Sequence, residues 1–402
     1  MIMQDNEKKP ALRFKGFTDP WEQRKFSELY EKVSRKNDLT YGKDDIISVA
    51  NMYYKAESYI TDENYLLTYN VFEMGDIAFE GNKSKNFAHG RFVENTIGNG
   101  IVSHVFDVFK PRMTNYDLQF WKYAINNERI MGPILLRSTK ASTMMTNLVA
   151  DDFLQENFLI PCYEEQKKIG EFLNQLDTLI TLHQRKHEKL VNIKKSMLDK
   201  MFPQNGVSVP EIRFKGFTDP WEQRKLGDIT VELSEYATQE LGLPLLTSSR
   251  SGLMYQDEYR DSRTTKSTET LFSVVPVGTC TYRHMSDDDV FHMNINTLEK
   301  GLVSREYPVF EASKGNNLEF LVQHINSSEE FKAFCAEQKK GGTRTRLYYN
   351  TLCQFTVRVP ALKEQAQISQ CLKKLDTLIT LHQRKLEKLQ NIKKSCLEKM
   401  FV

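Results

Sequence analysis

Short polar and basic stretches recur in predicted loops of this sequence, and their side chains are those that bind nucleic acids. Lysine and arginine can neutralise phosphates, while arginine, asparagine, serine and threonine can hydrogen-bond to base edges in the major groove. Any one such stretch is more often a solvated loop than a contact. The candidate DNA-contacting residues are Asn82, Lys83, Lys85, Arg91, Arg137, Thr139, Lys140 and Ser142 in the first half of the chain, and Ser249, Arg250, Arg283, His284, Lys340, Thr343, Arg344 and Arg346 in the second.

These stretches occupy matching places in the two halves of the chain. Residues 137–142 and residues 339–346 each end a predicted helix and precede the last predicted strand of their half. Residues 48–54 and residues 247–253 are dissimilar strings that also fill one equivalent place. This recurrence favours a binding role over that of ordinary solvated loops.

The sequence contains no recognisable catalytic or metal-binding pattern. A GxxxxGK[ST] phosphate loop is absent, since the Gly81-Asn-Lys-Ser-Lys85 text lacks the spacing, and neither HExxH nor an Asn/Asp-Pro-Pro-Tyr tetrapeptide occurs. The 6 cysteines fall at no CxxC spacing, so we expect reduced thiols in the core or at interfaces. We therefore predict a protein that is not an enzyme and binds no cofactor or metal itself.

The composition is that of a globular protein of two to three domains. The 402 residues include 55 Lys and Arg against 53 Asp and Glu, which gives a net charge of +2 and excludes a polybasic protein that coats DNA indiscriminately. No apolar run could span a bilayer, and the first residues lack the order of a signal peptide. We expect a cytoplasmic protein that makes no contact with membranes.

An internal repeat frames the candidate loops. Residues 13–25 recur unchanged as residues 213–225, and residues 176–202 return as residues 375–401 with four differences. The long stretches between them have diverged almost completely. What they still share is Gly75 with Gly278, the GIVS and GLVS texts beginning at Gly100 and Gly301, and the DLQF and NLEF texts beginning at Asp117 and Asn317. We therefore predict one fold in both halves, with different surfaces.

Each half ends in a predicted long helix with a heptad stripe. Pro161 and Pro360 stand where these helices should begin. An antiparallel coiled coil of the two helices would cover both stripes and relate the halves by a pseudo-twofold axis. The candidate coiled-coil or subunit-docking residues are Leu176, Leu179, His183 and Leu190, with Leu375, Leu378, His382 and Leu389. The two histidines, in mid-seam, are expected to set register or lie at an interface; a metal or proton-transfer role is the lesser alternative.

The divergent stretches mix strand and helix patterns. Alternating apolar residues predict strands in residues 71–81, 100–110, 271–282 and 301–312, whereas residues 116–127, 318–325 and 328–338 have helical periodicity. The predicted fold class is α+β, with two pseudo-twofold related α/β domains separated by the pair of long antiparallel helices. The expected segments are domain one in residues 1–160, helix one in 161–203, domain two in 204–359 and helix two in 360–402.

Two divergent modules, each preceded by the repeated segment 13–25 or 213–225 and followed by a near-identical long helix, resemble the specificity subunit of type I restriction-modification systems. The resemblance covers essentially the whole chain. The most specific matches are Pro161, Glu165, Gln166 and Ile169, repeated as Pro360, Glu364, Gln365 and Ile368. The resemblance implies that the divergent modules are target recognition domains, each reading one half of a bipartite, asymmetric site in double-stranded DNA. It also implies that the helices dock two methyltransferase subunits, which restriction subunits join.

S-adenosylmethionine, and ATP with magnesium for restriction, would then be bound by those partner subunits. Two alternatives remain open at the level of sequence. One is a duplicated sequence-specific regulator that acts without enzymes, and the other is a coiled-coil scaffold that does not bind DNA.

Overall fold

The structure is a computed structural model that describes residues 9–55, 60, 62–141, 145–203, 206–259, 270–339 and 343–402. The candidates Ser142 and Lys340 lie outside the described residues. The chain forms two compact units, Met1–Arg185 with Gln383–Val402, and Lys186–His382. These units differ from the four predicted segments, because each unit combines one module with a stretch of both long helices.

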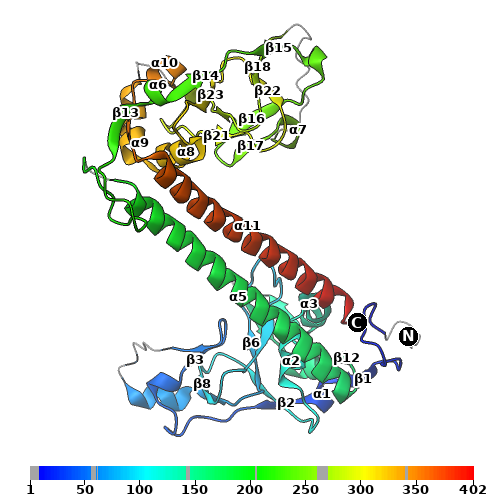
Figure 1. The fold of residues 1–402 in the computed structure, drawn as a ribbon. Coiled ribbons are helices and arrows are strands. Elements are labelled where there is room, and N and C mark those ends of the chain that lie inside the picture. Colours follow the sequence, from blue (N-terminus) through cyan, green and yellow to red (C-terminus); the bar gives the residue numbers. More distant parts are fainter. Residues whose placement is uncertain are drawn as a thin grey trace. The chain divides into compact units, whose positions relative to one another are not determined.

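The first unit contains a four-stranded antiparallel sheet, a two-stranded sheet, two hairpins and a strand pair beside the helix start (Figure 1). The sheet order is β2 (Tyr30–Val33), β9 (Val108–Pro111), β6 (Ile77–Glu80), β7 (Arg91–Glu94). The pairs are β5 (Asn70–Phe72) with β8 (Gly100–Val102), β3 (Ile47–Ser48) with β4 (Tyr53–Tyr54), β10 (Thr139–Ala141) with β11 (Thr146–Leu148), and β1 (Glu22–Lys25) with β12 (Asn157–Ile160). The helices are α1 (Phe26–Leu29), α2 (Leu118–Ala124), α3 (Glu128–Ser138) and α4 (Ala150–Gln155), with the 3-10 turns η2 (Lys43–Asp45) and η3 (Glu63–Thr68).

The second unit repeats this plan. Its four-stranded sheet has the order β14 (Thr230–Glu232), β23 (Val309–Ala312), β19 (Cys280–Thr281), β21 (Asn294–Ile295). The other strands are β15 (Tyr236–Ala237), β18 (Phe272–Val275) and β22 (Gly301–Ser304) in one sheet, with the pairs β16 (Leu246–Ser249) and β17 (Gly252–Tyr255), β20 (Met285–Ser286) and β24 (Thr345–Arg346), and β13 (Glu222–Lys225) and β25 (Thr356–Val359). The helices are α6 (Leu226–Ile229), α7 (Gln256–Tyr259), α8 (Leu318–Ser327), α9 (Glu329–Glu337), α10 (Tyr349–Leu352) and the 3-10 turn η4 (Gln239–Leu241). The α+β class and the shared fold are confirmed.

The few residues kept in both modules hold equivalent turns. Asp117 and Asn317 cap α2 and α8 by accepting hydrogen bonds from the backbone N–H three residues on. Gly75 and Gly278 have positive φ angles of 89° and 84°, a region that glycine enters without strain. Each of the four runs with a strand pattern contains two strands. Gly75 lies between β5 and β6 and Gly278 between β18 and β19, while residues 100–110 hold β8 and β9 and residues 301–312 hold β22 and β23.

The long helices are α5 (Tyr163–Met201) and α11 (Leu362–Lys399), and within each unit their stretches lie antiparallel (Figure 1). In the first unit Lys393 Nζ lies 2.5 Å from Asp177 Oδ1. In the second unit Lys194 Nζ lies 2.5 Å from Asp376 Oδ1, which is the same pair in the other copy. In the described part of the chain no helix is long and apolar enough to cross a membrane.

The repeated phrases join each module to the start of its own helix. Arg13 donates two hydrogen bonds of 2.7 Å to the buried carboxylate of Glu165, and Arg213 binds Glu364 in the same way at 2.7 and 2.8 Å. Each neighbouring glutamine, Gln166 or Gln365, donates to the carbonyl oxygen of the proline before the helix. Charge-assisted bidentate pairs fix orientation as well as distance. The motif residues that carry the family resemblance therefore have a structural role.

The far end of each helix packs on the other module. Phe202, which follows α5, contacts Trp221 and Phe320 of the second module, with ring centroids 6.1 and 5.5 Å away. Phe401, which follows α11, contacts Trp21 and Phe120 of the first module at 6.2 and 5.6 Å. Both phenylalanines are fully buried. Each unit is thus completed by the helix end of the other repeat.

The first unit has a buried carboxyl group with no counterpart in the second. Glu94 accepts a hydrogen bond from the Tyr116 hydroxyl, which lies 3.0 Å from the Tyr30 hydroxyl, and its other oxygen has no partner among the described residues. Burial raises the pKa of Glu94 well above its ordinary value. The equivalent residue, Ile295, cannot titrate.

We expect the unfolding free energy of the first unit to depend on pH through Glu94. A raised pKa in the folded state means that this stabilisation is complete below the ordinary pKa of a glutamate and declines as pH rises toward the folded-state pKa. Glu94→Gln should remove this decline. Urea unfolding at several pH values, followed by tryptophan fluorescence in a Trp221→Phe background, reports on Trp21 and Trp121 alone. An unchanged pH profile in Glu94→Gln would contradict the prediction.

Candidate functional site

Three loops of the first module converge beside one edge of its main sheet. They are the turn of the β3–β4 hairpin, the loop between β6 and β7, and the β10–β11 hairpin. Thr146 donates through its hydroxyl to the carbonyl oxygen of His89 at 2.9 Å and through its backbone N–H to that of Gly81 at 2.8 Å. Arg91 Nη2 donates to the carbonyl oxygen of Ala50 at 2.7 Å. The candidate stretches are therefore neighbours in space.

The second module brings together the equivalent loops. Asn294 donates to the Ser249 carbonyl oxygen at 2.8 Å, which ties the β16–β17 hairpin to β21. The pairing of β20 with β24 places the segment after Tyr282 beside the segment around Arg346, and Arg344 Nε lies 2.6 Å from Asp287 Oδ1. Each module therefore forms its own composite loop surface, and the three loops come from equivalent places in the two modules. We call these the first and second loop surfaces.

Several candidates of the first loop surface are exposed. Asn82, Lys83, Lys85 and Lys140 all have exposed side chains. A backbone bridge between Asn82 and Met145 holds the lysine-bearing loop against the β10–β11 hairpin. Amines here can reach a polyanion without breaking the core.

Other candidates in the first module make structural contacts. Arg91 Nε binds Glu80 at 2.7 Å and links β7 to β6. Thr139 donates to the Leu135 carbonyl oxygen at 2.6 Å. Arg137 forms a bidentate pair with Glu156 at 2.8 and 2.6 Å. It also lines a pocket together with Val402, the residue after Phe401, so its contacts lie beside the C-terminal end of α11 and not on the first loop surface.

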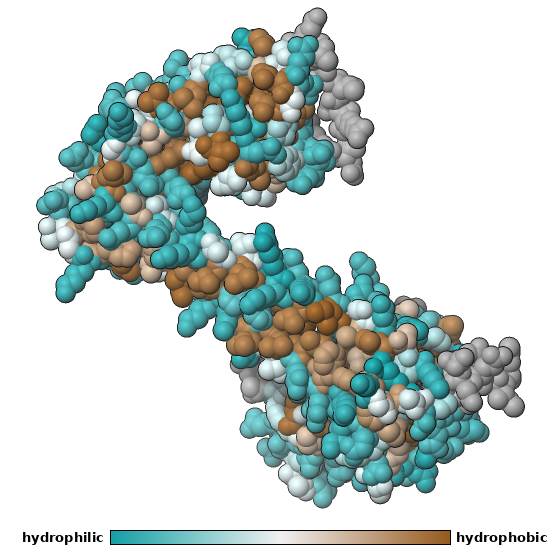
Figure 2. Space-filling view, turned by 45° about the vertical axis from the view of Figure 1, so that its right-hand side comes forward, coloured by the Kyte–Doolittle hydropathy of each residue, from teal (hydrophilic) through white to brown (hydrophobic). Residues whose placement is uncertain are grey.

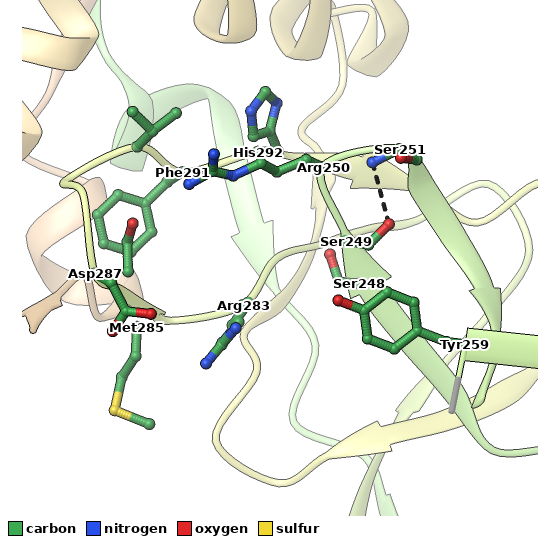
Figure 3. Close-up of a pocket in the computed structure, with 12 residues that line it drawn as sticks. Ser248, Ser249, Arg250, Ser251, Tyr259, Arg283, Met285, Asp287, Phe291 and His292 are labelled. Carbon is green, nitrogen blue, oxygen red and sulfur yellow. Dashed lines mark hydrogen bonds between the residues drawn. The ribbon is translucent and has the colours of Figure 1, made fainter. Parts of the chain in front are cut away.

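A polar pocket of about 240 Å³ opens in the second loop surface (Figure 3). Hairpin residues Ser249 and Ser251 stand on one side of it, Met285 and Asp287 on the other, and Arg283 lies between them. Hydroxyl, guanidinium and imidazole groups line it together, which suits hydrogen bonding to base edges and phosphates. Its lining residues include Ser248, Arg250, Tyr259 and His292.

The remaining candidates of the second module differ in whether their side chains are free to contact DNA. Arg283 and Arg346 are exposed and form no ion pair with any described residue, and Thr343 is also exposed. The Ser249 hydroxyl donates to the Gly252 carbonyl oxygen at 2.9 Å, within its hairpin. His284 is buried and stacks on Tyr348 at 5.7 Å. Burial lowers the pKa of His284, which favours the neutral ring at neutral pH, and the stacking on Tyr348 gives the ring a packing role.

Sequence reasoning missed several residues of the second loop surface. Asn294 orients the hairpin through bonds to the Ser248 hydroxyl and the Ser249 carbonyl, at 2.7 and 2.8 Å. Tyr259 and His292 line the pocket. A search for basic clusters passes over such uncharged residues. Their proximity in the sequence to Arg250 and Arg283 is the feature that could have identified them.

The long helices carry apolar side chains both inside and outside the seam. Leu176 is buried, and Leu190, Leu375 and Leu389 are partly buried, as expected for a seam. His183 and His382 are also partly buried in mid-helix, and each makes an interaction. Two further positions that we assigned to the heptad stripe are instead exposed: Leu179 and Leu378 are each 42% exposed.

The next turn adds a second exposed leucine in each copy, outside the heptad positions predicted from the sequence. Leu182 and Leu381 are each 44% exposed. The pairs Leu179 with Leu182 and Leu378 with Leu381 are three residues apart and so lie on one side of their helix. Apolar side chains are visible on the surface of the helical stretch in Figure 2. Each unit thus presents the same exposed leucine pair.

Among the described residues, no group of three or more His, Cys, Asp or Glu side chains could hold a metal ion.

Comparison with known proteins gives one family. The model of the type I restriction modification DNA specificity domain matches residues 18–192 and 292–391. The structure is similar to the S subunit of a type I restriction-modification system from M. genitalium, with a TM-score of 0.58 and 13% identity over 98% of this chain and 99% of that one. The HsdS subunit from Thermoanaerobacter tengcongensis matches with a TM-score of 0.46 and 14% identity, over 95% of this chain and 96% of that one. The similarity to the M. genitalium subunit shows that the two proteins share a fold over nearly the whole of both chains.

Proposed function

Because the chain belongs to the family of type I restriction-modification DNA specificity subunits, we propose that its two loop surfaces read the two halves of a bipartite, asymmetric DNA site. The observation that carries this proposal is the repetition of one loop architecture with different side chains. A single repeated fold with unlike recognition residues suits one operation on two unlike targets. Loops that carry arginine, asparagine and serine can enter the major groove, where each base pair shows a distinct pattern.

The exposed leucine pairs support docking of two methyltransferase subunits. Leucine is costly to expose, and an identical pair in each unit suits two copies of one partner. The recognition modules diverged while these helices stayed nearly identical, as expected if the DNA targets differ and the partners do not. Restriction subunits would join through the methyltransferases.

The chemistry would belong to the partners. S-adenosylmethionine would be held by the methyltransferase subunits, and ATP with magnesium by the restriction subunits. Methylation of an adenine within a duplex requires extrusion of the base, which the methyltransferase would perform on the site selected by this chain. This chain would contribute recognition and geometry.

Single-molecule methylation mapping tests the proposal. A host that carries this gene with its methyltransferase gene should show one bipartite N6-methyladenine motif, which disappears when this gene is deleted. Arg346→Ala should relax or abolish recognition of one half-site only, because Arg346 lies on the second loop surface. An unchanged methylation pattern with an active methyltransferase would overturn the proposal. Tight binding of a defined duplex without any methylated motif would favour a stand-alone regulator.

The length of the helices should set the number of unread base pairs between the half-sites. One heptad inserted into both α5 and α11 keeps the seam in register and adds about 10 Å, which is about three base pairs of DNA. We therefore expect a spacer longer by about three base pairs with both half-sites unchanged, as read by the same mapping. A spacer of the original length in an active complex would contradict this role of the helices.

A further inference from the structure

The second loop surface contains three consecutive carboxylates, and each is paired with a different cation. Asp287 Oδ1 lies 2.6 Å from Arg344 Nε, Asp288 pairs with Arg250, and Asp289 Oδ2 lies 3.6 Å from Lys339 Nζ. We call residues 287–289 the acidic turn. The three cations come from three separate segments: the β16–β17 hairpin, the end of α9 and the approach to β24.

Local geometry holds the acidic turn in place. Ser286 pairs with Thr345 in the β20–β24 ladder, and the Thr345 hydroxyl donates to the Asp289 carboxylate. Asp289 has a positive φ of 64°, a conformation that aspartate and asparagine tolerate better than most residues. Hydrogen bonds from the Ser286 hydroxyl and from Arg250 lower the pKa of Asp288, so this carboxylate stays charged.

The ion pairs of the acidic turn can be exchanged. The side chains of Arg250 and Arg344 are 63% and 51% exposed despite their partners. Exposed pairs contribute little to stability and are screened by salt. DNA phosphates, which also bind arginine and lysine, could therefore replace the three carboxylates without unfolding the module.

The first module has the opposite charge at the corresponding place. Its loop between β6 and β7 reads GNKSKNFAHG, with Lys83 and Lys85 and no carboxylate. The corresponding loop of the second module reads YRHMSDDDVFHM. The acidic turn is thus a feature of one recognition surface and not a requirement of the shared fold.

We infer that the acidic turn is a specificity-determining element that competes with the DNA backbone for Arg250, Lys339 and Arg344. This inference rests on the proposed DNA binding. A mixed-sequence duplex must displace the carboxylates and leave them without their partners, whereas the correct half-site adds base contacts that offset this cost. The acidic turn therefore weakens indiscriminate binding by the second module and makes its hold on DNA more selective.

The test is a triple variant, Asp287→Asn with Asp288→Asn and Asp289→Asn, in the full chain. Asparagine keeps the size of each side chain and tolerates the left-handed conformation at position 289. The probe is a fluorescent mixed-sequence 40-base-pair duplex, titrated by anisotropy between 50 and 200 mM KCl. We expect about tenfold tighter binding at the lowest salt, and a slope of log K against log salt that is steeper by about one to three units.

A matched control changes the same net charge elsewhere on the second unit. Asp228→Asn, Glu240→Gln and Glu311→Gln replace exposed carboxylates that form no ion pair with any described residue. This control should alter affinity and salt slope much less than the acidic-turn variant. Asp288→Asn alone, which releases only Arg250, should give a smaller change in the same direction, and it serves if the triple variant folds poorly.

The outcomes separate this inference from the proposed function. Unchanged or weaker binding by folded acidic-turn variants, with normal binding by the wild-type chain, would overturn the competition and leave DNA recognition standing. Equal tightening in the matched control would also overturn it, because net charge would then explain the effect. A wild-type chain that fails to bind any duplex, alone or with its methyltransferase, would overturn both.

Discussion

Phe202→Ala is expected to lower the unfolding free energy of the second unit by about 3–5 kcal/mol, although Phe202 directly follows the long helix of the first repeat. Its ring centroid lies 4.7 Å from that of His324 and 5.5 Å from that of Phe320, and the Phe202 side chain is buried. His324 is itself buried, and burial lowers its pKa to about 4, so this cluster contains no charge at neutral pH. Truncation of the phenylalanine leaves a cavity that rigid neighbours fill only in part.

The equivalent substitution should act on the other unit. Phe401→Ala removes contacts with Trp21 and Phe120, so it is expected to destabilise the first unit by a similar amount. Hydrogen-exchange mass spectrometry at fixed pH resolves the two units by their peptides. Val191→Ala, at an exposed position of α5, is the control. It should change the unfolding free energy derived from exchange by no more than about 0.5 kcal/mol in either unit. Destabilisation of the first unit by Phe202→Ala would contradict this arrangement.

The packing of each helix end on the module of the other repeat was not predictable from the sequence. The two helices end in the same Lys-Met-Phe text, so pattern alone cannot assign an end to a module. The helices themselves were predictable, because each heptad stripe is long and a proline, Pro161 or Pro360, marks where each helix begins. Antiparallel pairing followed from the need to cover two apolar stripes. The swapped ends follow from that pairing once each helix is long enough to reach beyond its own module.

The loop surfaces were predictable in outline and not in detail. Matching positions in two modules of one fold implied matching places in space, and the hairpins around Ser48 and Ser249 confirm this. Which cations remain available depends on carboxylates distant in sequence. Arg137 is held by Glu156 and Arg344 by Asp287, and such partners become apparent only when the chain is folded. Charge in a loop is therefore a weak guide to contact with DNA.

Replacement of one exposed leucine pair by glutamate is expected to remove one methyltransferase subunit from the complex. Leu179→Glu with Leu182→Glu replaces the two exposed leucines of the first unit by two charges. Burial of a leucine at an interface contributes about 1.5–3 kcal/mol, and an unpaired buried carboxylate costs more. The affinity of that docking surface should therefore fall by at least about a hundredfold. If the wild-type chain docks two methyltransferases as proposed, native mass spectrometry at micromolar concentration should show two subunits per wild-type chain and one per variant chain.

The repeat supplies the complementary variant and the control for this prediction. Leu378→Glu with Leu381→Glu should remove the other subunit, and the fourfold variant should remove both while the chain stays folded. Val277→Glu places a charge at an exposed apolar residue of the second module, away from the helices, and should leave two subunits bound. Retention of two methyltransferases in the fourfold variant would show that they dock elsewhere. Loss of both from either pair alone would instead mean that the two docking events depend on each other, because the pairs would then not act as separate sites.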